Sequence, residues 1–173
     1  MTVVLDPGHG GRDPGAVWSG VTEKELNLRI ALRLEKHLKS SGFRVVLTRR
    51  TDVSVSLARR VRIANRYRRA IFVSIHCNAS TTRSASGLET FYCSPRGCRI
   101  AQLIQGKTLK LIVGRNRGIK SAKFTVLTQT VHPAVLVECG FMSNRAELKR
   151  LRTSSHCDSL AKGIYGGILS YDG

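Results

Sequence analysis

The chain places two histidines and two glutamates where its predicted strands and helices begin or end. His9 and His76 each come at the end of a short apolar run typical of a buried strand, and Glu138 closes another. Glu23 stands in the first turn of a predicted helix. Two imidazoles and one carboxylate around an open position are the composition of a catalytic zinc site, and a second carboxylate nearby could act as general base and then as general acid. The composition leaves open which glutamate would bind the metal.

Each of these residues also has an ordinary explanation. A histidine in a surface loop often has no chemical role, and the helix dipole favours a carboxylate such as Glu23 at its amino end. Parallel strands, however, bring their carboxyl ends to one edge of a sheet, where ligands collect. Four such residues at one edge therefore favour metal-assisted hydrolysis over a chain without catalysis.

Alternating strand and helix signals determine where these residues lie in the fold. Apolar runs predict strands over residues 3–5, 44–48, 71–76, 87–92, 123–127 and 134–138. Helical periodicity predicts helices over residues 23–40, 56–69, 99–111 and 155–170, with a further helical segment after the turn at 140–144. Short joints between alternating strands and helices imply a right-handed α/β fold. We therefore expect a single three-layer domain over residues 1–173, with a mostly parallel central sheet flanked by helices.

The first two predicted helices carry more detail. Thr22 followed by Glu25 has the form of a capping box, and Gly42 would end the first helix. The residues of the second helix expected to face inward are Leu57, Val61, Ala64 and Tyr67. The arginines expected on its other face, in solvent, are Arg59, Arg60, Arg62, Arg66, Arg68 and Arg69.

The composition is strongly basic. The 173 residues include 29 Lys and Arg but only 11 Asp and Glu, which gives a formal charge of +18. Such an excess points to a polyanionic partner, either nucleic acid, an anionic membrane or an acidic wall polymer. No nucleic-acid-binding motif is present, and an aromatic content of 6% argues against a base-stacking platform. No apolar segment is long enough to span a membrane, and no secretory signal precedes the first strand.

The cysteines and the remaining motifs favour no other chemistry. The five cysteines have no metal-like spacing, although Cys93 and Cys98 flank a turn and could pair in an oxidising compartment. Cys77 and Cys139 follow His76 and Glu138 directly and so face the opposite side of the sheet, as core residues. The chain lacks a dinucleotide fingerprint, a phosphate loop and the Gly-x-Ser-x-Gly elbow of serine hydrolases.

Four motifs, in order and spread over the whole chain, resemble one known family. They are residues 4–11 (VLDPGHGG), 23–28 (EKELNL), 72–79 (FVSIHCNA) and 135–144 (VLVECGFMSN). They are similar to the zinc-dependent N-acetylmuramoyl-L-alanine amidases of the amidase-3 family.

The resemblance implies a site and a reaction. It implies one Zn²⁺ per chain held by His9, Glu23 and His76, with Glu138 as the catalytic carboxylate. The implied reaction is hydrolysis of the amide between N-acetylmuramic acid and the L-alanine of the peptidoglycan stem peptide. It further implies action outside the cytoplasm, in the periplasm or cell wall. We also expect a monomer, and the lack of nucleic-acid-binding motifs predicts no nucleic-acid partner.

Two departures from the family pattern lead to further expectations. Some members carry a long insertion between the second histidine and the catalytic glutamate, with a helix that plugs the site. Here the interval from His76 to Glu138 is short, so we expect an open site. The basic charge would suit retention on anionic wall polymers. The alternative function is a non-catalytic basic domain that binds an anionic wall polymer or nucleic acid.

Overall fold

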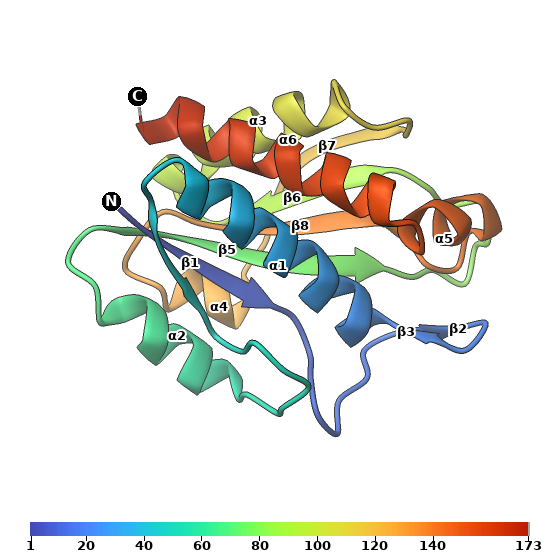
Figure 1. The fold of residues 1–173 in the computed structure, drawn as a ribbon, viewed down its shortest axis with the longest axis horizontal. Helices are drawn as coiled ribbons and strands as arrows, with labels where there is room; N and C mark the ends of the chain where they lie inside the picture. Colours follow the sequence, from blue (N-terminus) through green and yellow to red (C-terminus); the bar gives the residue numbers. More distant parts are fainter. Residues whose placement is uncertain (173) are drawn as a thin grey trace.

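The computed structural model describes residues 1–172, which form a central sheet between two layers of helices (Figure 1). The strands are β1 Thr2–Pro7, β2 Val17–Trp18, β3 Val21–Thr22, β4 Arg44–Leu47, β5 Ala70–Asn78, β6 Leu88–Tyr92, β7 Asn116–Ser121 and β8 Ala134–Phe141. The helices are α1 Glu23–Ser40, α2 Leu57–Asn65, α3 Pro95–Leu109, α4 Thr125–Thr128, α5 Arg145–Leu151 and α6 Ser154–Asp172. The expected three-layer α/β architecture is confirmed.

The central sheet has the strand order β4-β1-β5-β8-β6-β7. Strands β4, β1, β5 and β8 run parallel, whereas β6 pairs antiparallel with β8 and parallel with β7. The first four strands of the sheet are therefore all parallel, and only β6 and β7 at one edge run in the opposite direction. Because β1, β5 and β8 are neighbours, their carboxyl ends meet at one edge of the sheet.

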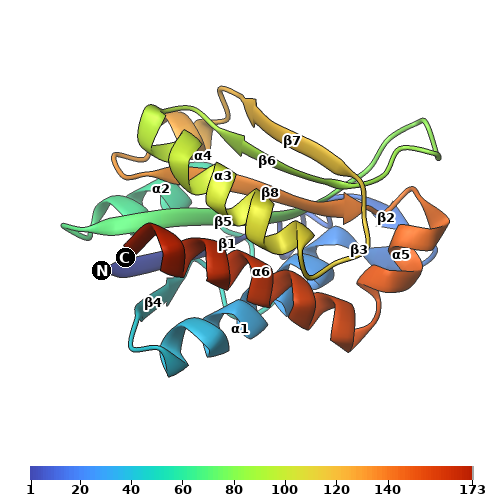
Figure 2. The same cartoon turned by 90° about the horizontal axis from the view of Figure 1, so that it is seen from above.

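The two faces of the sheet are covered unequally (Figure 2). Strand residues alternate between them, so that Val3 and Leu5 belong to one hydrophobic core and Val4 to the other. The helices that contribute to the first core are the long helices α1, α3 and α6 together with α5, whereas those that contribute to the second are the short helices α2 and α4. The second face is thinly covered, and this leaves room for a cavity on that side.

Helix α1 has the predicted bounds. Leu26, Ile30, Leu34 and Leu38 are all fully buried, as their spacing indicates. The Glu25 carboxylate accepts a hydrogen bond from the Thr22 backbone N–H over 3.4 Å, which is the capping interaction expected from the sequence. The helix begins at Glu23, so the Glu23 carboxylate lies at the end of α1 that faces the carboxyl end of β1.

The edge of the sheet differs from the prediction. The expected strand over 123–127 is wrong, because residues 125–128 form the single turn α4. The edge strand is instead β7, for which the sequence predicted no strand, and it pairs with β6. Val126 and Leu127 are buried in the second core by this helical turn, which a strand with alternating faces could not do.

Two helices differ in their bounds from the sequence prediction. Helix α2 ends at Asn65, and its first residue Leu57 is 54% exposed rather than inward-facing. Helix α3 begins at Pro95, four residues earlier than predicted, because the Ser94 hydroxyl accepts a hydrogen bond from the Gly97 N–H and Pro95 suits the first turn.

The five cysteines are free thiols. Cys77 and Cys139 are buried in the core, as predicted from the alternation of strand faces. Cys93 and Cys98 form no disulfide, and the Cys93 Sγ contacts the Leu127 carbonyl oxygen instead. Within residues 1–172, each helix is too short or too polar to cross a membrane.

Candidate functional site

Three of the four predicted site residues form one group. One ligand atom from each of His9, Glu23 and His76 lies within 4.8 Å of the others. The Nε2 of His9 is 3.1 Å from Glu23 Oε2, and the Nδ1 of His76 is 2.9 Å from Glu23 Oε1. The two imidazole rings are 4.9 Å apart at 78° to each other. Residues from the end of β1, the start of α1 and the end of β5 thus meet around a single point.

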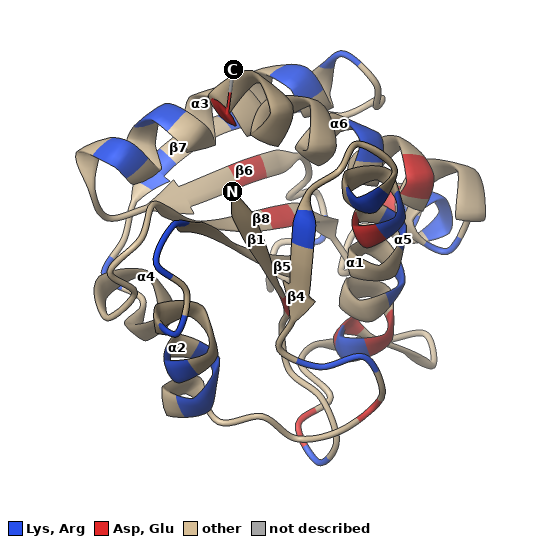
Figure 3. Ribbon diagram, turned by 60° about the vertical axis from the view of Figure 1, so that its left-hand side comes forward, with Lys and Arg blue, Asp and Glu red and all other residues tan. Residues whose placement is uncertain are grey.

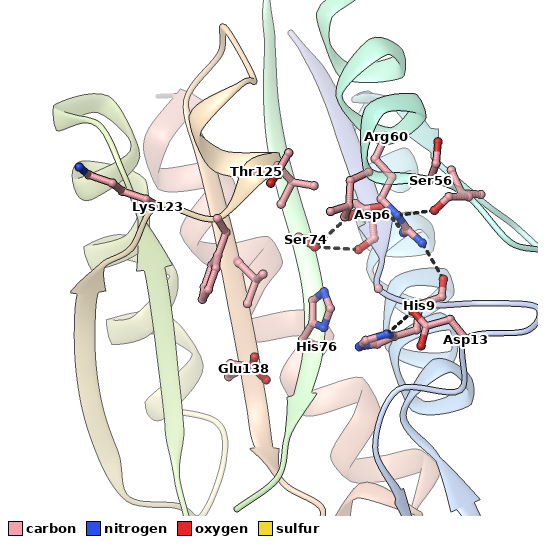
Figure 4. Close-up of a pocket in the computed structure, with 16 residues that line it drawn as sticks. Asp6, His9, Asp13, Ser56, Arg60, Ser74, His76, Lys123, Thr125 and Glu138 are labelled. Carbon is pink, nitrogen blue, oxygen red and sulfur yellow. Dashed lines mark hydrogen bonds and ion pairs between the residues drawn. The ribbon is translucent and has the colours of Figure 1, made fainter.

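Glu138 lies beside this group on the neighbouring strand. It is the register partner of His76, so both side chains project from the same face of the sheet. Both line a cavity of about 670 Å³ on the α2 and α4 side (Figure 4). The Glu138 Oε2 atom is buried and has no hydrogen-bond partner among residues 1–172. Burial raises the pKa of Glu138 to about 7, so this carboxylate is suited to exchanging a proton.

The loop after β1 sets the orientation of His9. His9 has a φ of 60°, a left-handed conformation that costs a non-glycine residue about 1–3 kcal/mol. Its Nδ1 is hydrogen-bonded to Asp13 Oδ2 over 2.7 Å, which leaves Nε2 facing Glu23. A carboxylate on the second ring nitrogen is the usual partner of a metal-binding histidine. Asp13 was not predicted as a site residue from the sequence, although its position four residues after His9 in the same glycine-rich loop was a usable signal.

Glu23 is held by four groups besides the His9 ring. Its Oε2 accepts a hydrogen bond from the Ala16 N–H, and its Oε1 lies within hydrogen-bonding distance of His76 Nδ1, Asn27 Nδ2 and the Cys77 N–H. Burial would raise the pKa of Glu23, but the hydrogen bonds with His76 and His9 outweigh it and hold the pKa well below its usual value. The hydrogen bond with Glu23 in turn raises the pKa of His9 to about 9. Glu23 is therefore ionised in its buried position.

This donor set fits a divalent metal ion. Two imidazole nitrogens and one ionised carboxylate converge, His9 and Glu23 are held by hydrogen bonds from outside the group, and both histidines line an open cavity. Imidazole and carboxylate ligands in this ratio suit zinc in a catalytic site. Such an arrangement, with Glu138 beside it, can support hydrolysis.

Both polar and apolar residues line the cavity next to the group formed by His9, Glu23 and His76. Asp6, Ser74 and Ser56 line it on the side of β1, β5 and α2, as seen in Figure 4. Leu57 and Phe124, which are exposed, belong to its apolar wall. A lining of both kinds is typical of a ligand-binding pocket.

One arginine of α2 contradicts the prediction of a solvated arginine face. Arg59 and Arg62 are exposed as expected, but Arg60 is only 4% exposed and forms an ion pair with Asp6. Arg60 shares the helix face of Val61 and Ala64, since positions 60, 61 and 64 follow the buried spacing of a helix. This spacing, together with the lone carboxylate in the apolar strand β1, indicates an inward Arg60, which was not predicted from the sequence.

Gly8 leaves the space that the His76 ring occupies. A Cβ atom at position 8 would lie 2.2 Å from His76 Cε1 and 2.3 Å from His76 Nε2. Gly8→Ala is therefore expected to displace the ring and to lower hydrolytic activity at least about 10-fold, because small misplacements of reacting groups are costly. A matched control is Gly106→Ala, since position 106 has open space around it. Activity of G8A equal to that of G106A would contradict the inferred position of His76.

Comparisons with known proteins agree with this fold. Residues 3–170 match the Amidase_3 family, N-acetylmuramoyl-L-alanine amidase. The N-acetylmuramoyl-L-alanine amidase LytC of Bacillus subtilis is 38% identical over 98% of this chain, which spans only 35% of LytC. The catalytic domain of the amidase CwlV from Bacillus (Paenibacillus) polymyxa superimposes with a TM-score of 0.95 at 37% identity, covering 98% of this chain and 97% of that one. The amidase AmiC2 of Nostoc punctiforme also gives a TM-score of 0.95, at 39% identity, with 99% and 96% covered.

Proposed function

The chain belongs to the Amidase_3 family of N-acetylmuramoyl-L-alanine amidases, and on this premise we propose that residues 1–173 form an amidase catalytic domain. Its reaction is hydrolysis of the amide between N-acetylmuramic acid and the L-alanine of the peptidoglycan stem peptide. The observation that carries this proposal is the convergence of His9, Glu23 and His76 beside the unpartnered carboxylate of Glu138.

His9, Glu23 and His76 would hold one Zn²⁺ per chain. When bound, zinc supplies a Lewis acid that polarises the scissile carbonyl and lowers the pKa of water. Asp13 keeps the His9 ring in its orientation, and the hydrogen bonds from Ala16 and Asn27 keep the Glu23 carboxylate fixed. These contacts reduce the reorganisation that metal binding would otherwise require.

Glu138 is the proton carrier in this proposal. Its free Oε2 accepts a proton from the water that attacks the amide carbonyl carbon, so that the new C–O bond forms. The same proton then passes to the L-alanine nitrogen as the C–N bond breaks. The products are the lactyl carboxylate of the muramic acid and the free amino terminus of the stem peptide.

Digestion of purified peptidoglycan tests the reaction and the open site together. The zinc-loaded chain is expected to cleave sacculi without any activator, because the cavity containing Glu138 is open. Mass spectrometry of the products should show stem peptides that begin with free L-alanine, together with glycan strands that keep intact sugar linkages. Cleavage elsewhere, or no cleavage by a zinc-loaded and folded chain, would contradict the proposal and favour a non-catalytic basic domain.

Peptidoglycan as substrate places the reaction outside the cytoplasm, in the periplasm or cell wall. All four site residues come from one chain, so a monomer is sufficient for activity. Lys and Arg residues occur on helices and loops in several parts of the chain (Figure 3), and they outnumber acidic residues 29 to 11. We therefore propose anionic wall polymers, rather than nucleic acid, as a second binding partner.

Retention on cell walls is expected to weaken as salt is raised. Exposed charges interact over about 10 Å at 0.1 M salt and only about 3 Å at 1 M, so an electrostatic contact should largely dissociate. Sedimentation of the E138Q variant with wall fragments, at increasing sodium chloride, measures this without digestion of the walls. Unchanged retention at 1 M salt would exclude charge as the cause, and equal retention on walls stripped of anionic polymers would exclude those polymers as the partner.

A further inference from the structure

Arg60 is buried directly beneath the loop that carries His9. Helix α2 turns this side chain inward, while its neighbours Arg59 and Arg62 remain exposed. Its partner Asp6, in β1, is also buried, and the Arg60 Nη1 atom lies 2.6 Å from Asp6 Oδ1. A buried ion pair costs desolvation energy that a surface arginine would avoid. The position of the Asp6–Arg60 pair next to the site therefore indicates a role other than adding charge to the surface.

The Arg60 guanidinium binds three backbone carbonyls in addition to Asp6. Its Nη2 donates to the His9 carbonyl over 2.7 Å, and its Nη1 donates to the Pro7 carbonyl over 2.8 Å. Its Nε donates to the Val55 carbonyl over 3.0 Å. Figure 4 shows the hydrogen bonds to His9 and to Asp6. The planar guanidinium thus connects the end of β1, the His9 turn and the segment before α2.

Asp6 in turn fixes the direction of the guanidinium. Its Oδ1 also accepts a hydrogen bond from the Thr48 hydroxyl over 2.6 Å, and its Oδ2 accepts one from the Ser74 hydroxyl over 2.8 Å. Thr48 follows β4 and Ser74 lies in β5, so residues from both sides of β1 hold the carboxylate. The ion pair is therefore anchored to the rigid sheet, and not to the loop that it contacts.

His9 needs such an anchor because its backbone is strained. A histidine with a φ of 60° persists only where the surroundings enforce that conformation. Asp13 holds the ring, but it belongs to the same loop and moves with it. The bond from Arg60 to the His9 carbonyl is a contact from a separate element to the strained residue itself.

We propose that the Asp6–Arg60 pair is a positioning device that holds His9 in its metal-binding conformation. The inference rests on the proposed function, in which His9 is a zinc ligand. Arg60 acts through the His9 backbone and is not itself expected to touch zinc. Loss of the Arg60 side chain should therefore weaken zinc binding, whereas the rate of hydrolysis at saturating zinc should change much less.

The test compares Arg60→Lys with Arg62→Lys on the same helix. Lysine at position 60 keeps the charge for Asp6 but lacks the fork that reaches the carbonyls. Zinc dissociation constants of the metal-free proteins are measured by competition with a chromophoric chelator, at a temperature where circular dichroism shows both variants folded. R60K is expected to bind zinc about 10–100-fold more weakly than the wild type, the range typical of lost outer contacts, and R62K within about 2-fold. Raising the zinc concentration should restore most of the kcat of R60K, which a purely structural defect would not allow.

The double variant Asp6→Asn with Arg60→Met makes the same test without a buried unpaired charge, should R60K fail to fold. Suppose that the variant that folds binds zinc with wild-type affinity and that its crystal structure retains the left-handed His9 backbone. This result would overturn the inference and leave the amidase proposal intact. A wild-type chain that binds no zinc and cleaves no peptidoglycan would instead overturn the proposed function, and this inference with it.

Discussion

Glu138→Gln is expected to lower kcat for peptidoglycan hydrolysis by about 10²–10⁴-fold, the usual contribution of a general base. Glutamine keeps the size of the side chain but cannot accept the proton of the attacking water. Because Glu138 lies on β8, outside the group formed by His9, Glu23 and His76, zinc should remain bound with wild-type affinity. Turnover on purified sacculi and zinc content by elemental analysis, in the same preparation, measure both effects.

The control for this prediction is Glu25→Gln, which removes the same charge from an exposed position on α1. It should leave kcat within about 2-fold of the wild type, and it should lower stability by a few tenths of a kcal/mol to about 1 kcal/mol as the cap weakens. E138Q with near-normal turnover would refute the assignment of Glu138 as the proton carrier. E138Q that loses zinc as well would instead make Glu138 a metal ligand.

His76→Ala is expected to remove both zinc and activity. Without one of three protein ligands the site should lose most of its metal affinity, and the loss of a Lewis acid worth several kcal/mol corresponds to a decrease of 10³-fold or more in rate. A chelator should inactivate the wild type to the same extent, and added zinc should restore the wild type but not the variant. Zinc should also stabilise the wild type by about 2.7 kcal/mol at 100 times its dissociation constant, as seen in thermal unfolding.

The matched control for His76→Ala is His156→Ala, because His156 lies on α6 and outside the group of possible ligands. It should keep zinc, activity and zinc-dependent stabilisation. Zinc retained by H76A at full occupancy would mean that His76 is not a ligand. Undiminished activity of the wild type after complete removal of metal would contradict metal-assisted hydrolysis altogether.

Short-range signals in the sequence were sufficient for most elements of the fold. The bounds of α1 follow from apolar spacing and the Thr22–Glu25 cap, because both are interactions within a few residues. The continuous apolar runs of β1, β5 and β8 predicted internal parallel strands, because a strand that is buried on both faces is apolar along its length. Since those runs end at or near His9, His76 and Glu138, the meeting of these residues at one edge was predictable before any contact was known.

Local sequence patterns did not predict the structure where the environment of a residue comes from distant parts of the chain. The direction of β6 and the pairing of β7 depend on which strand edge is free once β8 has joined the sheet. A local sequence pattern does not indicate this pairing. The helical turn α4 replaced a predicted strand because it buries Val126 and Leu127 against the core beside β8. Local apolar content alone did not distinguish these two conformations.

The sequence alone therefore determined the layered α/β fold, the bounds of its first helix and the four residues of the candidate site, because each depends on local periodicity and on where strands end. The tertiary structure decided which charges are buried and what holds the site in shape. Arg60 lies inward because Asp6, far from it in the sequence, offers a carboxylate that compensates its desolvation. That energy arises only when β1 and α2 come together, so the spacing within α2 could indicate which face position 60 shares but not that its charge would be compensated there.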